Sequence, residues 1–256
     1  MRLAKIPAGR RAVQRRTFPF RYPTMPDLQA LIFDMDGVLI HNTPVQARAF
    51  QLLFRDLGLT TNARRLLRCL NGMPATEILQ SVFRHEVPKK QLEEYAAQRE
   101  FLYRTLYWSQ RQPLAGLVEF LTAARAAGLK IGLGTGSGGP TLAYILDHLD
   151  LRRHFDVVVG KDDVRQGKPH ADTYAVVARK LGVGPAHCLV FEDATLGEQA
   201  AYRAKMACVG VLTTLKAKDF QAPLTVINDY TGLTTERLRE LFAQAGSVPK
   251  PRKALA

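Results

Sequence analysis

Two aspartates stand one residue apart at the end of an apolar run, in the segment 33–38, which reads FDMDGV. In extended backbone the side chains of residues i and i+2 share a face, so Asp34 and Asp36 both face one site. Such a pair supplies a carboxylate that attacks phosphorus and a second one that carries a proton, and both can help to hold a cation. The pair therefore predicts phosphoryl transfer, although an acidic turn after a strand would contain the same residue types.

A glycine-rich turn and a lysine supply groups that bind an anion. The segment 134–139 reads GTGSGG, and it offers the Thr135 hydroxyl and the backbone N–H of Gly136 ahead of a helix expected near residue 140. Such a turn is a typical anion site, and it is equally typical of a flexible loop. Lys168, in Gly-Lys-Pro at 167–169, offers a compact positive charge for a phosphate and for Asp34. A solvated surface lysine is the alternative for any single residue of this type.

Two further acids, Glu192 and Asp193, follow the apolar run at 188–191, the fourth along the chain. Neighbouring carboxylates at the end of a buried strand are costly unless a cation neutralises them. Together with Asp34 they form an oxygen-rich set of the kind that Mg²⁺ prefers. An acidic loop ahead of a helix explains one of these acids better than both. The order of acid pair, hydroxyl turn, lysine and acid pair along the chain favours one shared site.

Strand-like apolar runs alternate with helical patterns along most of the chain. Strands are expected at 28–33, 129–133, 155–159, 188–191 and 207–212, and helices at 117–127 and 171–181. Short apolar strands that alternate with helices predict a doubly wound α/β fold, with a parallel sheet covered on both faces. Because sites in such folds lie at the carboxyl ends of the strands, the segments described above should meet at one edge.

Residues 43–112 interrupt this alternation. Helices are expected there at 45–57, 63–70, 75–83 and 89–107, with no strand pattern among them. We therefore expect an all-helical cap domain that is inserted after the first strand. The predicted catalytic α/β core consists of residues 27–42 and 113–240, flanked by a basic leader at 1–26 and a tail at 241–256.

The net charge of +13 lies largely at the ends of the 256 residues. Residues 1–26 contain seven arginines and lysines and no acid, which suits nucleic-acid or lipid contact as well as a disordered leader ahead of Met25. We expect residues 1–26 to be a disordered leader, and we expect no nucleic-acid partner. The chain contains no run of about 18 apolar residues, so no membrane span is expected. Three scattered cysteines fit neither a disulfide framework nor a zinc site and indicate the cytoplasm.

Four segments of the chain resemble the motifs of the haloacid dehalogenase-like (HAD) superfamily. They are residues 33–38, 135–137, 167–169 and 191–193, together with Gly197. Within this superfamily the chain is similar to the β-phosphoglucomutase-like phosphatases with a helical cap, over residues 28–240. The resemblance implies a HAD-like Rossmannoid core and an aspartyl-phosphate intermediate on the nucleophile Asp34. It implies that Asp36 protonates the leaving group and then activates water.

The same resemblance implies how the phosphate and the metal ion are held. Thr135 and Gly136 bind the phosphoryl oxygens, and Lys168 balances charge between nucleophile and phosphate. The implied Mg²⁺ ligands are Asp34, the backbone carbonyl of Asp36, Glu192 and Asp193.

Departures from the family pattern bear on the reaction. The segment 41–44 reads HNTP where an acid followed by Ser or Thr is usual, and Gln46 stands where mutase members carry a histidine. The cap loop 70–75 lacks the arginine that grips a second phosphate in the mutases, and Asn71 replaces the glutamate of related pyrophosphatases. These changes favour hydrolysis.

We therefore expect a cytoplasmic, Mg²⁺-dependent phosphatase that acts on a small phosphorylated metabolite such as a sugar phosphate. Asn42, Asn71 and Met73 are expected to face the substrate from the cap. The alternatives are a β-phosphoglucomutase-type phosphomutase and a non-catalytic phosphate-binding or regulatory protein; the complete set of four motifs argues against the latter. Neither the substrate nor the oligomeric state follows from the sequence.

Overall fold

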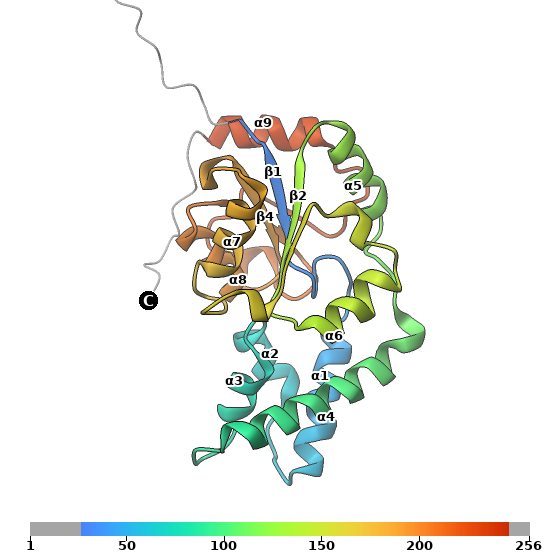
Figure 1. Ribbon diagram of the computed structural model, residues 1–256, viewed down its shortest axis with the longest axis vertical. Coiled ribbons are helices and arrows are strands. Elements are labelled where there is room, and N and C mark those ends of the chain that lie inside the picture. The colour runs from blue at the N-terminus through green and yellow to red at the C-terminus, as the bar shows by residue number, and fades with distance from the viewer. Residues whose placement is uncertain (1–26, 246–256) are drawn as a thin grey trace, which may run out of the picture.

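The computed structural model describes residues 27–245, so the predicted leader lies outside the described residues. Within this range the centre is a parallel sheet of six strands in the order β3-β2-β1-β4-β5-β6 (Figure 1). The strands are β1 (Ala30–Phe33), β2 (Lys130–Gly134), β3 (Val157–Val159), β4 (Cys188–Glu192), β5 (Ala207–Val211) and β6 (Thr225–Ile227).

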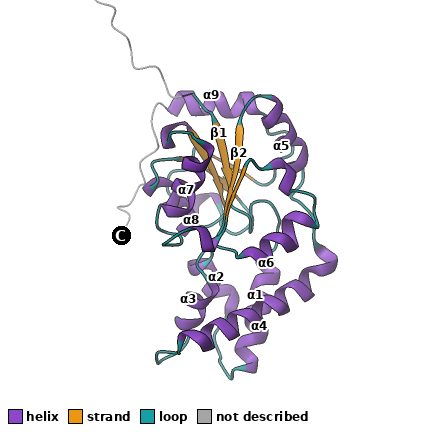
Figure 2. Cartoon of the chain, viewed as in Figure 1, coloured by secondary structure: helices purple, strands orange, loops and turns teal. Residues whose placement is uncertain are grey.

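Helices cover both faces of the sheet because the central strands are apolar on both sides (Figure 2). On one face α5 (Leu117–Ala126) and α9 (Thr235–Ala245) share a core with Phe33 of β1. On the other face α7 (Asp172–Leu181) and α8 (Thr195–Arg203) pack against Ile32. The predicted doubly wound α/β fold is confirmed.

The chain order reverses beside β1, with β2 and β3 on one side and β4, β5 and β6 on the other. The carboxyl ends of β1 and β4 therefore border a topological switch point, where doubly wound proteins bind their ligands. Phe33 of β1 pairs with Leu133 of β2 and Phe191 of β4. This register brings the residues that follow all three strands to the same edge.

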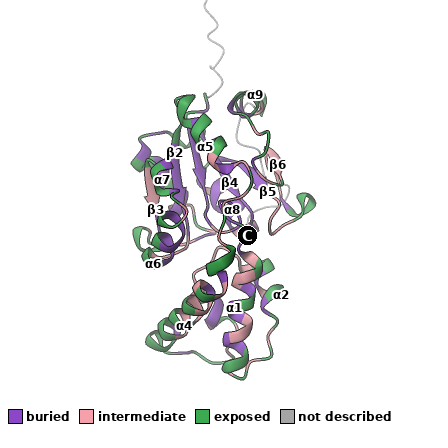
Figure 3. Ribbon diagram, turned by 90° about the vertical axis from the view of Figure 1, so that its right-hand side faces the viewer, coloured by how far each residue is buried: buried purple, intermediate pink, exposed green. Residues whose placement is uncertain are grey.

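Between β1 and β2 the chain forms the helices α1 (Thr43–Asp56), α2 (Ala63–Leu70), α3 (Ala75–Gln80) and α4 (Lys89–Tyr107). They surround an apolar core of their own that includes Phe50, Phe54 and Leu79. Figure 3 shows these helices as a separate layer beyond the carboxyl ends of the strands, with buried residues on their inner sides. We refer to residues 43–110 as the cap.

Two neighbouring segments connect the cap to the sheet. The backbone N–H of Leu114 donates to the carbonyl of Leu39 at 2.8 Å, and Ile40 forms an antiparallel bridge with Pro113. After β2 the chain forms the short helix α6 (Gly139–Leu142), which continues into a π-helical turn.

Two elements near the end of the described chain were not expected from the sequence. β6 has only three residues, all half-buried, so it shows no alternation of apolar and polar positions. Helix α9 runs through Ala245, past the predicted start of the tail at residue 241, because Leu238 and Phe242 are buried against the sheet. In the described range no helix is both long and apolar enough to cross a bilayer.

Candidate active site

Asp34 follows the last residue of β1, and Lys168 holds its carboxylate. The Lys168 ammonium lies 2.9 Å from Oδ1 of Asp34 and 2.6 Å from Oε1 of Glu192, and all three side chains are buried. The aromatic ring of Tyr174 lies 5.0 Å from the same ammonium. Lys168 is thus fixed between two carboxylates.

Glu192 is the best-anchored acid of the site. Its Oε1 accepts from Lys168 and from the Tyr174 hydroxyl at 2.5 Å, and its Oε2 accepts from the backbone N–H of Asp193 at 2.9 Å and of Ala194 at 3.1 Å. Both oxygens are therefore engaged by the protein. Glu192 fixes Lys168 and the turn after β4, and it leaves Asp34 and Asp193 as the acids with free coordination capacity.

Gly197 on α8 leaves the space that the Glu192 carboxylate fills, since an added Cβ would overlap that carboxylate. We expect Gly197→Ala to displace Glu192, to release Lys168 and to lower the free energy of unfolding by about 1–3 kcal/mol, as overpacking typically does. Denaturant unfolding together with a phosphatase assay measures both effects.

Gly184→Ala is the matched control, because Gly184 has φ −66° and an added Cβ there meets only ordinary contacts. Unchanged stability and activity in Gly197→Ala would show that Glu192 does not depend on this close approach.

Asp193 completes the acid cluster. Asp34, Glu192 and Asp193 each place a carboxylate oxygen within 4.8 Å of the others. Thr214 donates to Oδ2 of Asp193, and Asn71 of the cap donates to the same oxygen at 3.4 Å. Its Oδ1 is buried and has no hydrogen-bond partner among residues 27–245.

The electrostatics of this cluster fit a divalent cation. Burial raises the pKa of Asp34 to about 7, even though Lys168 acts to lower it. Burial also raises the pKa of Asp193 well above its usual range, and the charges of Glu192 and Asp34 raise it further. One lysine thus does not neutralise three buried carboxylates. An ion bound at the orphaned oxygen of Asp193 would supply the missing positive charge.

Asp36 lies two residues after Asp34, and three side-chain donors hold its carboxylate. Its Oδ1 accepts from Asn42 at 2.5 Å and from Gln46 at 3.3 Å, and its Oδ2 accepts from the Ser137 hydroxyl at 3.0 Å. Burial raises the pKa of Asp36, although the hydrogen bonds from Asn42 and Ser137 act to lower it. The orientation of the Asp36 carboxylate is therefore fixed by Asn42, Gln46 and Ser137.

Asn42 does not face the substrate as the sequence suggested. It is completely buried behind Asp36, and its amide also donates to the Tyr103 hydroxyl of α4 at 2.7 Å. Asn42 thus positions Asp36 and joins it to the cap. Ser137, which was not singled out from the sequence, was signalled by its hydroxyl in the glycine-rich turn.

The glycine-rich turn that was predicted to bind an anion follows β2. Thr135 is buried, and its hydroxyl accepts from the backbone N–H of Ser137 at 3.2 Å. A Cβ added to Gly136 would lie 3.1 Å from the carbonyl of Gly72, so the cap loop approaches this turn closely. Gly138 then caps α6, and its carbonyl accepts from the backbone N–H groups of Thr141 and Leu142.

A cavity of about 410 Å³ lies between cap and sheet and brings these parts together. Of the predicted site residues, it is lined by Asp34, Asp36, Thr135, Gly136, Asn71 and Met73. Lys168, Glu192 and Asp193 are buried beside Asp34 and do not line it. Arg99 and Glu100 of α4 also line the cavity. Neither residue was predicted from the sequence, because charged residues within a helical pattern usually lie on a solvent-exposed face.

Comparison with known proteins agrees with this geometry. Residues 31–211 match the model of the haloacid dehalogenase-like hydrolase family. Fructose-1-phosphate phosphatase YqaB of Escherichia coli is 35% identical over 183 residues, which cover 71% of this chain and 95% of that protein. A phosphorylated carbohydrates phosphatase of Thermotoga maritima is 30% identical over 174 residues, 68% of this chain and 80% of that protein.

A solved β-phosphoglucomutase from Clostridium difficile superposes with a TM-score of 0.76 at 24% identity, covering 85% of this chain and 98% of that one. This likeness shows the shared fold. The predicted family is confirmed, and so is the predicted enzyme class, a phosphoric monoester hydrolase. The chain belongs to the haloacid dehalogenase-like hydrolase family.

Proposed function

We propose that this hydrolase is a Mg²⁺-dependent phosphatase that releases phosphate from a small phosphorylated metabolite through an aspartyl-phosphate on Asp34. The observation that carries the proposal is the pair of carboxyl groups, buried Asp34 and half-buried Asp36, on the wall of one cavity, with Lys168 at 2.9 Å from Asp34. The free thiols of the three cysteines support a cytoplasmic location.

The reaction divides between the two aspartates. Asp34 attacks phosphorus, and as the bond to the leaving oxygen breaks, Asp36 donates its proton to that oxygen. Asp36, now ionised, takes a proton from the water that attacks the aspartyl-phosphate, so that phosphate leaves and both carboxyl groups return to their starting state. Thr135 and the N–H of Gly136 donate to the phosphoryl oxygens, and Lys168 screens the charge of the nucleophile.

The metal ligands of the proposal are Asp34, Asp193 and the backbone carbonyl of Asp36, with Glu192 assisting from behind through Lys168 and the turn. When bound, the ion supplies positive charge that reduces repulsion between the anionic nucleophile and the anionic substrate. The orphaned Oδ1 of Asp193 supports this assignment.

Two observations support hydrolysis over transfer to a sugar. Gln46 stands beside Asp36, where a titratable histidine was expected for a mutase. The names of the curated relatives describe phosphatases of phosphorylated sugars and carbohydrates. We therefore propose that the substrate is a sugar phosphate or a close relative, and that the product is free phosphate.

Metal removal tests the proposal. We expect phosphate release from a panel of phosphorylated metabolites to fall roughly a hundredfold or more in EDTA, and to recover when Mg²⁺ is added back, because the acid cluster then repels the substrate. Phosphate release and sugar phosphate isomers are measured in the same samples.

Full turnover in EDTA would contradict the role of the cation. An isomerised sugar phosphate without free phosphate would contradict hydrolysis.

A further inference from the structure

Two oppositely charged neighbours on α4, Arg99 and Glu100, form part of the wall of the active-site cavity. Their side chains are only 11% and 19% exposed, and a guanidinium nitrogen of Arg99 lies 3.1 Å from Oε2 of Glu100. No step of the mechanism above uses them. Charged groups that are so far removed from solvent are retained at a cost, which points to a role in binding.

The Arg99–Glu100 pair lies close to the reacting atoms. Arg99 donates to Oε1 of Gln46 at 2.5 Å, and Nε2 of Gln46 donates to Asp36 at 3.3 Å. A single amide group thus separates the pair from the acid that protonates the leaving oxygen. The carbon atoms next to that oxygen are the part of the substrate that lies within reach of the pair.

The surrounding structure holds both side chains in place. The Arg99 guanidinium lies 4.9 Å from the ring centre of Phe50, and the hydroxyl of Thr141 donates to Glu100. Because Thr141 belongs to α6 and Glu100 to the cap, this contact also fixes the wall relative to the glycine-rich turn. A preorganised pair of this kind binds a ligand with little loss of side-chain entropy.

The pair keeps hydrogen-bonding capacity on both sides. A carboxylate accepts about four hydrogen bonds and a guanidinium donates five, whereas Glu100 accepts from Thr141 and Arg99, and Arg99 donates to Gln46 and Glu100. A hydroxyl group both donates and accepts, so adjacent hydroxyls match adjacent acceptor and donor groups.

Another part of the cavity wall is apolar and includes Leu67, Met73 and Ile78. A cavity with charged hydrogen-bonding groups on one part of its wall and an apolar surface on another suits a hydroxylated carbon chain, which has polar edges and C–H faces. Resting on the function proposed above, we propose that Arg99 and Glu100 bind neighbouring hydroxyls of the leaving group and thereby select polyol and sugar phosphates.

A second anionic group on the substrate is the competing possibility. Arg104 and Lys161 also line the cavity, and neither has a carboxylate partner within residues 27–245. However, Glu100 already neutralises Arg99, and its carboxylate would repel a second phosphate near the leaving oxygen. The charge balance beside Asp36 therefore favours neutral hydroxyls.

Paired substrates test the proposal without disturbing the chemistry. We expect the wild type to hydrolyse a hexitol phosphate with a higher kcat/KM than n-hexyl phosphate, which has the same carbon chain without the hydroxyls. Glu100→Gln should lower kcat/KM for the hexitol phosphate roughly tenfold to hundredfold, the range of a lost charge-assisted hydrogen bond. The same substitution should change kcat/KM for hexyl phosphate less than about threefold, because hexyl phosphate has no hydroxyl for Glu100 to bind. Arg99→Lys should act in the same direction, since lysine lacks the planar fork.

Hydrolysis of hexyl phosphate serves as the internal check that each variant folds. Glu94→Gln, an exposed change on the same helix that lies outside the cavity wall, is the matched control and should leave both substrates unaffected. Equal losses on both substrates would overturn the proposal, as would a wild type that prefers hexyl phosphate or a sugar bisphosphate. Failure of the wild type to hydrolyse any ester would instead refute the function proposed above.

Discussion

Asp34→Asn is expected to lower phosphate release by at least roughly ten-thousandfold while the protein stays folded. An amide does not attack phosphorus, and loss of a covalent nucleophile typically costs several orders of magnitude in kcat. The fold should survive because the substitution has the same shape, and because Lys168 keeps its ion pair with Glu192 at 2.6 Å. The amide also removes a carboxyl group whose charged form is disfavoured by burial. Phosphate release and thermal unfolding are measured side by side.

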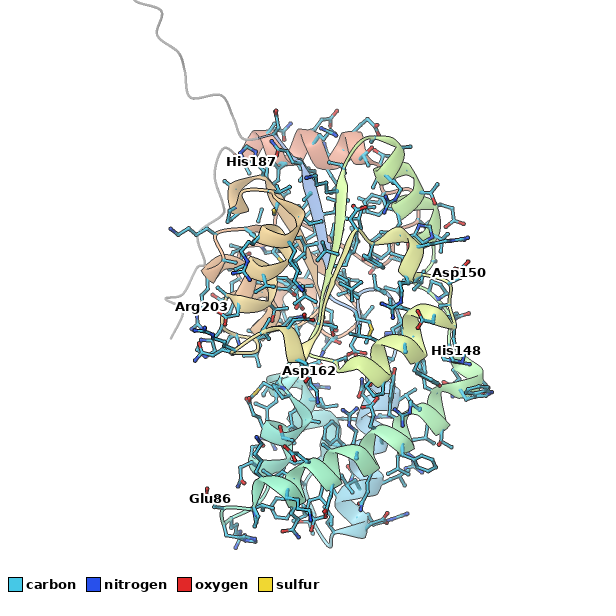
Figure 4. The ribbon with its side chains drawn as sticks, viewed as in Figure 1. Glu86, His148, Asp150, Asp162, His187 and Arg203 are labelled. Atoms are coloured by element: carbon cyan, nitrogen blue, oxygen red, sulfur yellow. The ribbon has the colours of Figure 1, made fainter. Side chains whose placement is uncertain are left out.

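Glu86→Gln is the matched control for this prediction. It is the same acid-to-amide change at an exposed position in the part of the cap that lies far from the sheet (Figure 4). We expect it to leave turnover unchanged. If Asp34→Asn retained more than about a tenth of wild-type activity, Asp34 would not be the nucleophile, and a water-mediated mechanism would have to replace the aspartyl-phosphate.

Lys168→Met is expected to destabilise the protein as well as to inactivate it. The substitution leaves the buried carboxylates of Asp34 and Glu192 without their shared cation, and removal of one partner from a buried ion pair typically costs about 3–5 kcal/mol. Burial acts to lower the pKa of Lys168, yet the charges of Asp34 and Glu192 raise it above its usual range. Lys168 therefore stays charged at neutral pH, and the stabilisation that its raised pKa represents is lost only as the pH rises above its unfolded pKa. Urea unfolding in the absence of metal measures the loss.

The control is Lys180→Met, since Lys180 forms an exposed ion pair with Asp163 at 3.1 Å. Exposed pairs contribute about 0–1 kcal/mol, so this variant should unfold almost as the wild type does. Added Mg²⁺ should restore part of the stability of Lys168→Met, because an ion at the acid cluster compensates the same carboxylates. Equal stabilities of the two variants would mean that the acids around Lys168 are neutral in the native protein.

The acids and the lysine of the core were predictable because a parallel sheet places strand ends together. Asp34 and Asp193 directly follow buried runs of four and five residues. Once these runs are identified as neighbouring parallel strands, their carboxylates must meet. The fold class followed from the same alternation of strands and helices.

The cap side of the cavity was less predictable for a physical reason. Whether Arg99 and Glu100 face solvent or substrate depends on how α4 packs against α1 and the sheet, which a single amphipathic pattern does not determine. Asn42 was assigned to the substrate, whereas its burial reflects contacts with Asp36 and with Tyr103, which is 61 residues away in the chain. Pairings over such distances follow from tertiary structure alone.

The separation of the cavity wall into two independently packed parts has an evolutionary consequence. The groups proposed to react with phosphorus belong to loops after the strands. Arg99 and Glu100 of α4, and Met73 in the loop between α2 and α3, belong instead to the cap, which has its own apolar core. Mutations in the cap can alter which metabolite is accepted without disturbing bond-making atoms. Proteins that inherit this scaffold can therefore diverge in substrate specificity while they keep one reaction.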